Sequence, residues 1–294
     1  METAALILQG KDDFTANKPV AGVLPLQRII RTLKYAGIKR VVLAGDEYIM
    51  GEAFNHVTRL EAEFIHPTRS KKKILSYQLN AVTYLKDKCE KMLVVPAYYP
   101  LFDISTAKRM ADTDAALAAP VFKGKRGYPV LVFQKHFDDL IRTNCDVEKL
   151  FNENPWEKIA VDDEGVTADV TGTADVEAIA AKLALRQKMR PGFKLTLRRE
   201  ASVYGPGMQE LIRLVGETGS LQQTFTLMGM SAAYGRRLIA ETEAGLGFRI
   251  FETIGSRYNR TIVSEEVKEF AAKYKAFHED CVKLIEDSFK RHFG

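Results

Sequence analysis

Four polar side chains of types that contact DNA lie close together in the chain: Ser231, Tyr234, Arg236 and Arg237. Guanidinium groups bind phosphate oxygens and guanine edges, and tyrosine hydroxyls bind phosphate. Ser231 is a typical N-cap residue, because its hydroxyl oxygen can accept a hydrogen bond from a free amide of the first helical turn. The sequence therefore favours a helix after Ser231 that presents cations to the major groove.

The segment before Ser231 would have to hold this helix in place. Gly219-Ser220 predicts the end of one helix and the capped start of the next, whose apolar side carries Leu221, Phe225 and Leu227. Residues 228–230, Met-Gly-Met, predict the turn. The whole is typical of a helix-turn-helix, and the alternative is a plain helical hairpin.

Two more arginines, Arg257 and Arg260, lie in a segment that predicts a β-hairpin. Residues 248–252 and 260–263 are expected to form short strands around a turn rich in Gly, Ser, Arg and Asn. Such a hairpin after a helix-turn-helix would be a wing, and its arginines would approach phosphates or the minor groove.

Residues 193 to 275 resemble the winged-helix domain of molybdate-responsive and LysR-type regulators. The resemblance rests on a strand over 193–198, a helix over 207–215, Glu217-Thr218-Gly219-Ser220, Met228-Gly229-Met230-Ser231, the hairpin, and Thr261-Ile262-Val263-Ser264 opening a helix. It implies DNA binding, although the wing is shorter and has fewer glycines than that family's wing. A winged helix that binds protein is the alternative.

A second set of candidate residues lies in the first half of the chain, in loops that follow apolar runs. These residues are Gly10, Lys11, Lys18, Gly45, Tyr98, Lys125, Arg126 and Gly127. The apolar runs 4–8, 41–45 and 92–96 predict buried parallel strands, and ligands of open α/β sheets bind beyond the carboxyl ends of such strands. Lysines and backbone amides there would bind phosphate groups of a ligand.

Residues 1 to 190 resemble the MobA-like nucleotidyltransferases. The similarity lies in residues 6–10, Lys18-Pro19, residues 27–33, Ala36-Gly37-Ile38, and residues 124–130, where tyrosine replaces the histidine of that family's Gly-His-Pro segment. It implies an α/β fold of the Rossmann-like, GT-A-like kind, with a mostly parallel sheet and helices on both faces. It also implies that the first loop and its lysine hold nucleotide phosphates, and that an aspartate after the third strand carries magnesium.

The chain departs from that family at the residues that matter for catalysis. Tyr98 stands where the metal-binding aspartate is expected, and a phenol is a poor Mg²⁺ ligand beside a carboxylate. The first loop carries Asp12 and Asp13 where a triphosphate would lie. Substitute carboxylates would be Asp169, Asp175, Asp103 and Asp12, although helix capping is the simpler role for Asp103. We therefore assign no catalytic residue and no metal site from the sequence.

Further helices are expected over 25–36, 76–86, 106–111 and 175–185, and further strands over 115–121 and 130–133. Residues 186–192, basic and ending in Pro-Gly, predict a linker, so we expect an α/β domain over 1–190 and a DNA-binding domain over 191–294. The 294 residues suffice for two cores. The net charge of +5 permits binding to nucleic acid without requiring it.

The three cysteines have no metal-like spacing, the five histidines are scattered, and no apolar run reaches the ~18 residues that span a membrane. We expect a cytoplasmic protein. The segment from residue 265 to the end predicts one long helix with a heptad seam of Val267, Phe270, Tyr274, Phe277, Cys281, Leu284 and Ser288. The seam either packs on the chain's own domains or forms a homodimer that would set two recognition helices ~34 Å apart.

Together these features predict a DNA-binding transcriptional regulator whose α/β domain senses a nucleotide, sugar-phosphate or pterin-type ligand. The alternative is an active nucleotidyltransferase of the molybdenum-cofactor cytidylyl- or guanylyltransferase type. That enzyme would use Mg²⁺ with CTP or GTP, release pyrophosphate, and keep the winged helix as a regulatory module.

Overall fold

The structure is a computed structural model, and it describes residues 2–8, 18–45, 62–65, 75–172, 175–186, 189–199, 202–254 and 260–293. The chain divides into two compact units, Met1–Gln187 (unit 1) and Lys188–Gly294 (unit 2), which are described separately below. No helix among the described residues combines the length and the apolar character that crossing a membrane requires.

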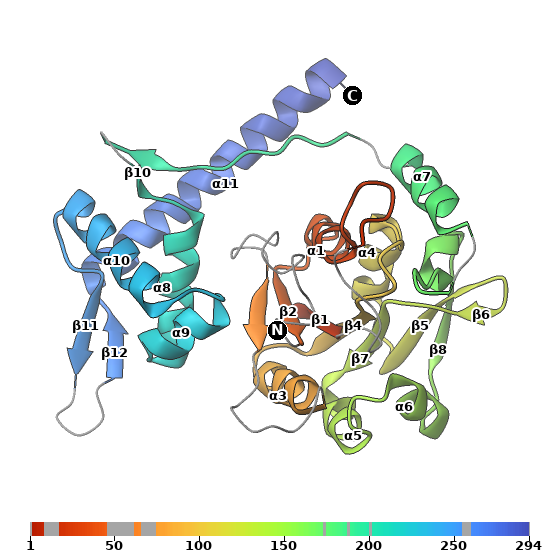
Figure 1. The fold of residues 1–294 in the computed structure, drawn as a ribbon. Coiled ribbons are helices and arrows are strands. Elements are labelled where there is room, and N and C mark those ends of the chain that lie inside the picture. Colours follow the sequence, from red (N-terminus) through yellow and green to blue (C-terminus); the bar gives the residue numbers. More distant parts are fainter. Residues whose placement is uncertain are drawn as a thin grey trace. The chain divides into compact units, whose positions relative to one another are not determined.

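Unit 1 is built on a mixed sheet with strand order β3-β2-β1-β4-β7-β5-β6, and β8 pairs with β5 (Figure 1). The parallel core consists of β1 (Thr3–Leu8), β2 (Arg40–Ala44), β3 (Glu63–Ile65) and β4 (Lys91–Pro96). The strand β7 (Val130–Phe133) runs antiparallel to both β4 and β5 (Leu117–Phe122). The short strand β6 (Lys125–Arg126) closes a hairpin with β5, and β8 (Glu157–Ala160) lies parallel to β5.

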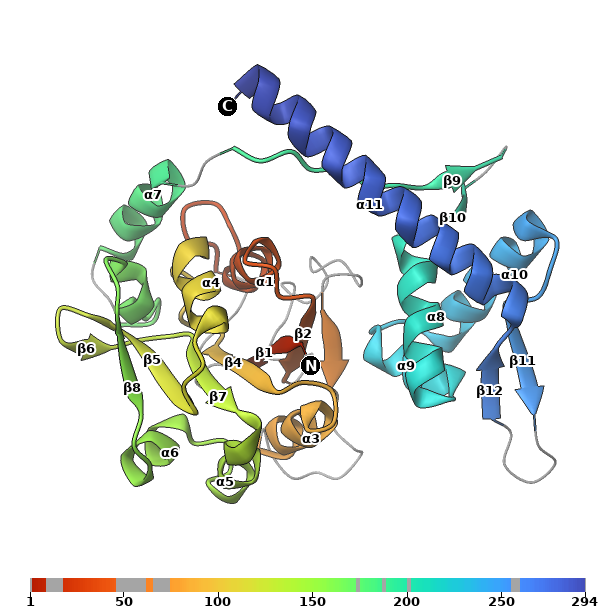
Figure 2. The ribbon, with the colours of Figure 1, turned by 180° about the vertical axis from the view of Figure 1, so that it is seen from behind.

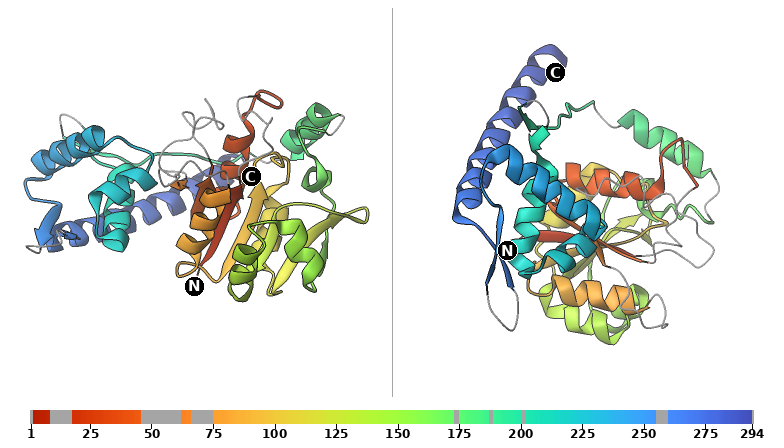
Figure 3. Two further views of the ribbon diagram at one scale, coloured as in Figure 1. Left: turned by 60° about the horizontal axis from the view of Figure 1, so that its bottom comes forward. Right: turned by 60° about the vertical axis from the view of Figure 1, so that its left-hand side comes forward.

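Helices cover both faces of this sheet (Figures 1 and 3). One face packs on α1 (Pro25–Tyr35) and α4 (Ile104–Asp112); the other packs on α3 (Leu75–Leu85), α5 (Phe137–Arg142) and α6 (Val147–Glu153). Alternate strand residues supply the two cores: Ala5 and Ile7 point to the first, and Leu6 and Leu8 to the second. The helix α7 (Val176–Arg186) packs with Val20, Leu101 and Ala168 in a third, smaller cluster.

The α/β fold with a mostly parallel sheet and helices on both faces is confirmed, as are the strands and helices expected in unit 1. The elements β3, β6, β8, α5 and α6 were not predicted. Two one-turn 3₁₀ helices, Gln134–His136 and Glu164–Thr167, were also not expected. All these elements are short, so neither periodicity nor length distinguishes them from loops.

Unit 2 begins with an extended segment and a small hairpin of β9 (Leu197–Arg198) and β10 (Ser202–Tyr204). The strand expected over 193–198 is therefore wrong for residues 193–196. Three helices follow: α8 (Pro206–Thr218), α9 (Leu221–Leu227) and α10 (Ala232–Leu246). An antiparallel hairpin of β11 (Phe251–Ile254) and β12 (Arg260–Val263) leads into the 29-residue helix α11 (Glu265–Phe293).

The segment before β9 runs along α11 (Figure 2). The Tyr274 hydroxyl donates to the Leu195 carbonyl at 2.9 Å, and the rings of Phe193 and His278 stack with centroids 5.3 Å apart. In α11 the buried residues are Val267, Ala271 and Tyr274, all in its first ten positions. The expected seam is buried only in its first half: Tyr274 packs inside unit 2, whereas Phe277 and Leu284 are exposed, and dimerisation through the seam stays a prediction.

Candidate functional site

The carboxyl ends of β1, β2 and β4 meet at one edge of the sheet because these strands are parallel. The Ala97 amide donates to the Leu8 carbonyl at 2.9 Å, which joins the turn after β4 to the end of β1. Gly45 lies at the end of β2 at the same edge. Gly10 and Lys11, like Asp12 and Asp13, lie outside the described residues.

Three tyrosine rings form a cluster at this edge, with neighbouring rings tilted by 44° and 40° to each other. The ring centroids of Tyr98 and Tyr99 are 5.0 Å apart, and those of Tyr99 and Tyr128 are 4.7 Å apart. Tyr98 and Tyr99 are half-buried, while Tyr128 is buried. Burial raises the pKa of the Tyr128 phenol far above its usual value, and nearby Glu148 raises it further, so this hydroxyl stays protonated. The sequence analysis singled out Tyr98 but missed the other two rings.

Asp169 is the candidate carboxylate that the fold brings to Tyr98. The Val170 amide donates to the Tyr98 carbonyl at 2.9 Å, so the segment carrying Asp169 runs beside the turn after β4. Asp169 Oδ1 accepts hydrogen bonds from the Thr171 amide at 2.7 Å and the Thr171 hydroxyl at 2.6 Å. Asp169 thus closes its own tight turn, directly before the residue that contacts Tyr98.

The other carboxylates have structural roles or lie apart. Asp103 caps α4, because its side chain accepts from the Thr106 amide at 2.7 Å. Asp163, which the sequence analysis missed, is buried and accepts hydrogen bonds from the Asp103 amide, the Thr106 hydroxyl and the Gly165 amide at 2.8 to 3.0 Å. Burial nevertheless raises the pKa of the Asp163 carboxyl. Asp175 is exposed.

The cations expected around the pocket differ in their surroundings. Lys18 is exposed, as is Lys125. Arg126 pairs with Glu148, and its guanidinium lies 4.9 Å from the Phe151 ring and 5.7 Å from the Trp156 ring. Those contacts hold Arg126 within unit 1, so any contact with a ligand would have to compete with them.

Gly127 has a packing role that its type alone did not reveal. A Cβ at Gly127 would lie 2.3 Å from the Val166 carbonyl oxygen, so only glycine fits there. The Tyr128 amide donates to that same oxygen at 2.8 Å. Gly127 therefore allows Tyr128 to reach its place in the tyrosine cluster.

Arg28 holds the turn that follows Lys18. The turn joins Val20 to Val23 through Ala21 and Gly22, both with positive φ, and Arg28 Nη2 donates to the Val20 carbonyl at 2.8 Å. From α7, Glu177 accepts the Ala21 amide at 2.7 Å. Burial lowers the pKa of the Arg28 guanidinium, and Glu177 partly offsets that effect. These contacts fix the backbone two residues after Lys18.

The described residues do not fit the magnesium site of a nucleotidyltransferase. They contain no group of three or more His, Cys, Asp or Glu that could hold a metal ion. At the position expected for the first carboxylate stands a phenol, and Asp169 is occupied in its own turn. No reaction step through a metal follows from this geometry.

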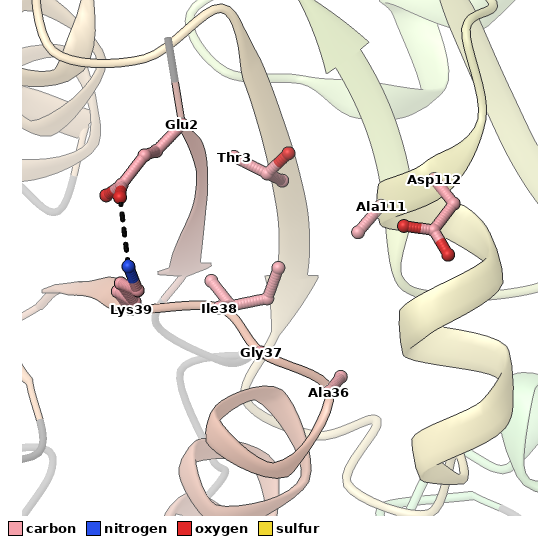
Figure 4. A pocket seen from close by; sticks show the side chains of 8 residues that line it. All are labelled: Glu2, Thr3, Ala36, Gly37, Ile38, Lys39, Ala111 and Asp112. Carbon is pink, nitrogen blue, oxygen red and sulfur yellow. Dashed lines mark hydrogen bonds and ion pairs between the residues drawn. The ribbon is translucent and has the colours of Figure 1, made fainter. Parts of the chain in front are cut away.

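A cavity of about 280 Å³ lies at the opposite edge of the sheet (Figure 4). Its lining comes from the start of β1, the loop between α1 and β2, and the end of α4. Lys39 and Glu2 pair across it at 3.3 Å. The cavity contains none of the residues that the sequence analysis expected to bind a ligand.

In unit 2 the two helices α9 and α10 pack closely through a glycine. Ser220 caps α9 and Ser231 caps α10, each accepting a backbone amide three residues on. A Cβ at Gly235 would lie 2.4 Å from the buried Phe225 ring, so the first turn of α10 approaches α9 as closely as backbone allows. The capped helices and the turn at Gly229, which has positive φ, agree with the expected boundaries.

The β11–β12 hairpin is tied to the turn between α8 and α9. The Thr261 amide donates to the Gly219 carbonyl at 2.9 Å, and the Arg260 side chain lies across Gly219, where an added Cβ would be 2.9 Å from Nε. Gly219 has φ of 64°, which glycine adopts without strain. The hairpin and the α8–α9 turn are therefore packed together, with Arg260 exposed on their surface. Arg257 lies outside the described residues.

The cations of α10 are exposed, as the sequence analysis expected. Arg236 and Arg237 are on the surface, and Tyr234 is 41% exposed. The Arg237 guanidinium lies 5.5 Å from the Tyr234 ring centroid and 3.6 Å from a Glu241 oxygen. Ser231, Tyr234, Arg236 and Arg237 thus all lie on the surface at the start of α10.

No protein-family model matches the chain, and neither does any curated protein. Among solved structures, Rv0371c from Mycobacterium tuberculosis is similar with 16% identity and a TM-score of 0.49, over 61% of this chain and 98% of that one. A nucleotidyl transferase from Methanothermobacter is similar with 12% identity and a TM-score of 0.48, over 64% and 99%. A 2-C-methyl-D-erythritol 4-phosphate cytidylyltransferase from Thermus thermophilus is similar with 16% identity and a TM-score of 0.44, over 63% and 100%.

Proposed function

We propose that the protein is a ligand-responsive DNA-binding regulator. Unit 1 binds a nucleotide, sugar-phosphate or pterin-type ligand at the carboxyl edge of its sheet, and unit 2 binds duplex DNA through α10 and the β11–β12 hairpin. The observation that carries the DNA-binding part is the packing of Gly235 on Phe225. It fixes α10 against α9 and leaves Arg236 and Arg237 at the exposed start of a capped helix.

The electrostatics of unit 2 support this assignment. A helix N-terminus and two guanidinium groups create positive potential over the first turns of α10. Arg260, across Gly219, adds a cation on the hairpin side. Glu241 and Glu243 follow on α10, so only its first turns suit contact with phosphate.

DNA binding is tested by the fluorescence anisotropy of a labelled duplex from the protein's own upstream region, with salt varied from about 50 to 200 mM. We expect a specific complex whose affinity falls with salt. The Arg236→Ala/Arg237→Ala variant should lower the magnitude of the log–log salt slope by about 1 for each phosphate that is no longer neutralised. The control is Arg142→Ala, which removes an exposed cation of unit 1 and should leave binding unchanged. Absence of a specific complex, or wild-type binding by the double variant, would overturn the proposal.

Ligand binding by unit 1 is tested by thermal shift with nucleotides, sugar phosphates and pterins. A ligand at 100 times its Kd stabilises the folded state by about 2.7 kcal/mol, which is a readily measured shift. Lys18→Ala should reduce the shift, because it removes an exposed cation two residues before the backbone that Arg28 fixes at Val20. Lys39→Ala, at the opposite edge, is the matched control. If Lys39→Ala removes the shift and Lys18→Ala does not, the ligand binds in the cavity that Lys39 lines.

The second candidate function is nucleotidyl transfer, which is favoured by the contact between the segment carrying Asp169 and the turn after β4, although Asp169 would have to leave its own turn to bind a metal ion. The test is release of pyrophosphate from CTP or GTP with a pterin or sugar-phosphate acceptor. Release that Lys18→Ala and Asp169→Asn both abolish would support the enzyme. If no acceptor gives release while the same nucleotide produces a thermal shift, unit 1 binds the ligand without transferring it.

A further inference from the structure

The second half of α11 has no buried residue among those described. The last buried residue is Tyr274, and the helix continues to Phe293, about five more turns. Phe277 is 50% exposed and Leu284 is 69% exposed. Large apolar side chains at this spacing are typical of a helix that buries one face against another molecule.

The exposed face of α11 has a regular charge pattern. Lys273, Phe277, Asp280, Leu284, Asp287 and Arg291 follow at steps of four, three, four, three and four. At 100° per residue these side chains fall within an arc of about 80° and form one stripe along the helix. Lys273 and Asp287 are 78% and 71% exposed. The stripe is basic at both ends and acidic between them.

We propose that two copies of this chain associate through antiparallel pairing of α11, about a two-fold axis near Asp280 and Cys281. In this register Phe277 packs against Leu284 of the second copy, and Leu284 against the second copy's Phe277. Lys273 meets the second copy's Asp287, and Glu269 meets its Arg291. The axis repeats each contact, so the interface contains two apolar pairs and four opposite-charge pairs.

Charge selects this orientation over the parallel one. Parallel pairing in register places Lys273 beside Lys273 and Asp287 beside Asp287, which is repulsive. In the antiparallel register the single like-charge contact is Asp280 with its own copy at the axis. Within one helix, Lys273 and Glu269, and Lys290 and Asp287, pair at 3.9 Å while largely exposed. Such pairs are weak and leave these side chains available to the second copy.

The proposal is tested by light scattering during size-exclusion chromatography of the full chain at roughly 100 µM, a concentration that populates even a micromolar dimer. We expect twice the chain mass of 33.0 kDa. Asp287→Lys should weaken the dimer at least tenfold, because it places two lysines opposite each other on both sides of the axis. The Lys273→Asp/Asp287→Lys variant should restore it by reversing both charges.

The matched control is Glu279→Lys, which makes the same charge change as Asp287→Lys at an exposed position of α11 outside the stripe. It should leave the mass unchanged. Circular dichroism checks that each variant folds, which we expect because all these side chains are exposed. A wild-type monomer, or a charge-reversed variant no more dimeric than Asp287→Lys, would overturn the proposal.

The native cysteines give a second readout of the axis. Cys281 is half-buried and lies next to the proposed axis, whereas Cys89 and Cys145 are buried in unit 1. A bis-maleimide reagent should link two chains in good yield, and Cys281→Ser should abolish the product. The same Cys281→Ser variant should still dimerise by light scattering, which serves as the control. Linkage that persists without Cys281 would show that the copies meet elsewhere.

Discussion

At the scale of single residues, Gly235 is required by packing, because any side chain at this position would collide with the buried Phe225 ring. Alanine has a higher helix propensity than glycine, so an exposed Gly→Ala change in a helix stabilises by roughly 0.5–1 kcal/mol. At Gly235 the new Cβ would lie 2.4 Å from Phe225, which is buried and cannot yield.

We therefore expect Gly235→Ala to destabilise unit 2 by about 1–3 kcal/mol, the usual cost of overpacking. The matched control is Gly216→Ala in α8, whose Cβ would meet Val263 at an ordinary 4.0 Å and should stabilise. Urea denaturation followed by circular dichroism measures both. Equal effects of the two substitutions would mean that α9 and α10 do not pack as described.

Residue types predicted some roles and not others. The caps at Asp103, Ser220 and Ser231 follow from chemistry local to the helix start, and the structure confirms them. The tyrosine cluster could not be predicted, because Tyr128 reaches Tyr99 through a sheet order that the sequence does not specify. The contacts of Arg126 could not be predicted either, because its partners Glu148 and Phe151 come from α6, a helix too short to recognise in the sequence.

At the scale of elements, the start of α10 has two roles: Ser231 caps the helix, and the same surface is proposed to contact DNA. Substitutions at Ser231 can separate the two roles. Ser231→Ala removes the oxygen that accepts the Tyr234 amide, so it should cost about 1 kcal/mol of unfolding free energy. Ser231→Asp keeps a capping oxygen and should retain the stability. Its negative charge should nevertheless weaken DNA binding several-fold.

Melting curves and the anisotropy assay on the same samples test this separation. If Ser231→Asp binds DNA as tightly as the wild-type chain, the start of α10 does not face phosphate. A loss of stability in Ser231→Asp equal to that of Ser231→Ala would mean that the side chain does not cap the helix.

Apart from β9, the long amphipathic helices and apolar strands were predictable within three residues, since periodicity and burial agree there, and the largest differences are the end of α8 at Thr218 and the start of β11 at Phe251. The elements around β8, α5 and α6 were not, because each is fixed by tertiary packing on strands or helices far away in sequence. The helix α11 shows the limit of periodicity. The heptad seam predicted one apolar face but not how far unit 2 covers it: Val267 and Tyr274 are buried, while Phe277 and Leu284 stay exposed.

At the scale of the whole molecule, two buried cysteine thiols should lower the free energy of unfolding at high pH. Burial raises the pKa of Cys89 from 9.0 to about 11 and that of Cys145 from 9.0 to about 12. Above pH 9 the unfolded chain loses these protons while the folded chain keeps them. The unfolded state then binds fewer protons, so the free energy of unfolding falls as pH rises.

The expected loss is about 1.4 kcal/mol per thiol for each pH unit within these windows. Denaturation of the wild-type chain and of Cys89→Ala, compared from about pH 8 to 10.5, isolates one thiol from the other ionising groups. The two stability curves should converge as pH rises above 9. Parallel curves would show that Cys89 ionises equally in both states.

Ser264 joins the hairpin of unit 2 to its longest helix. Its hydroxyl donates to the Arg249 carbonyl at 2.7 Å and accepts the Val267 amide at 3.3 Å, while its own amide donates to the Ile250 carbonyl at 3.0 Å. The hydrogen bonds of Ser264 therefore join the base of the hairpin to the start of α11. A straight helix of 29 residues is about 43 Å long, and the burial of Val267, Ala271 and Tyr274 makes its first ten residues part of the same packed body as Ser264.

A rotation of that packed body by about 5° about Ser264 would displace the far end of the helix by roughly 4 Å, more than the rise of two helical residues. A small rotation of the hairpin together with the start of α11 would therefore become a larger displacement at the end of the helix.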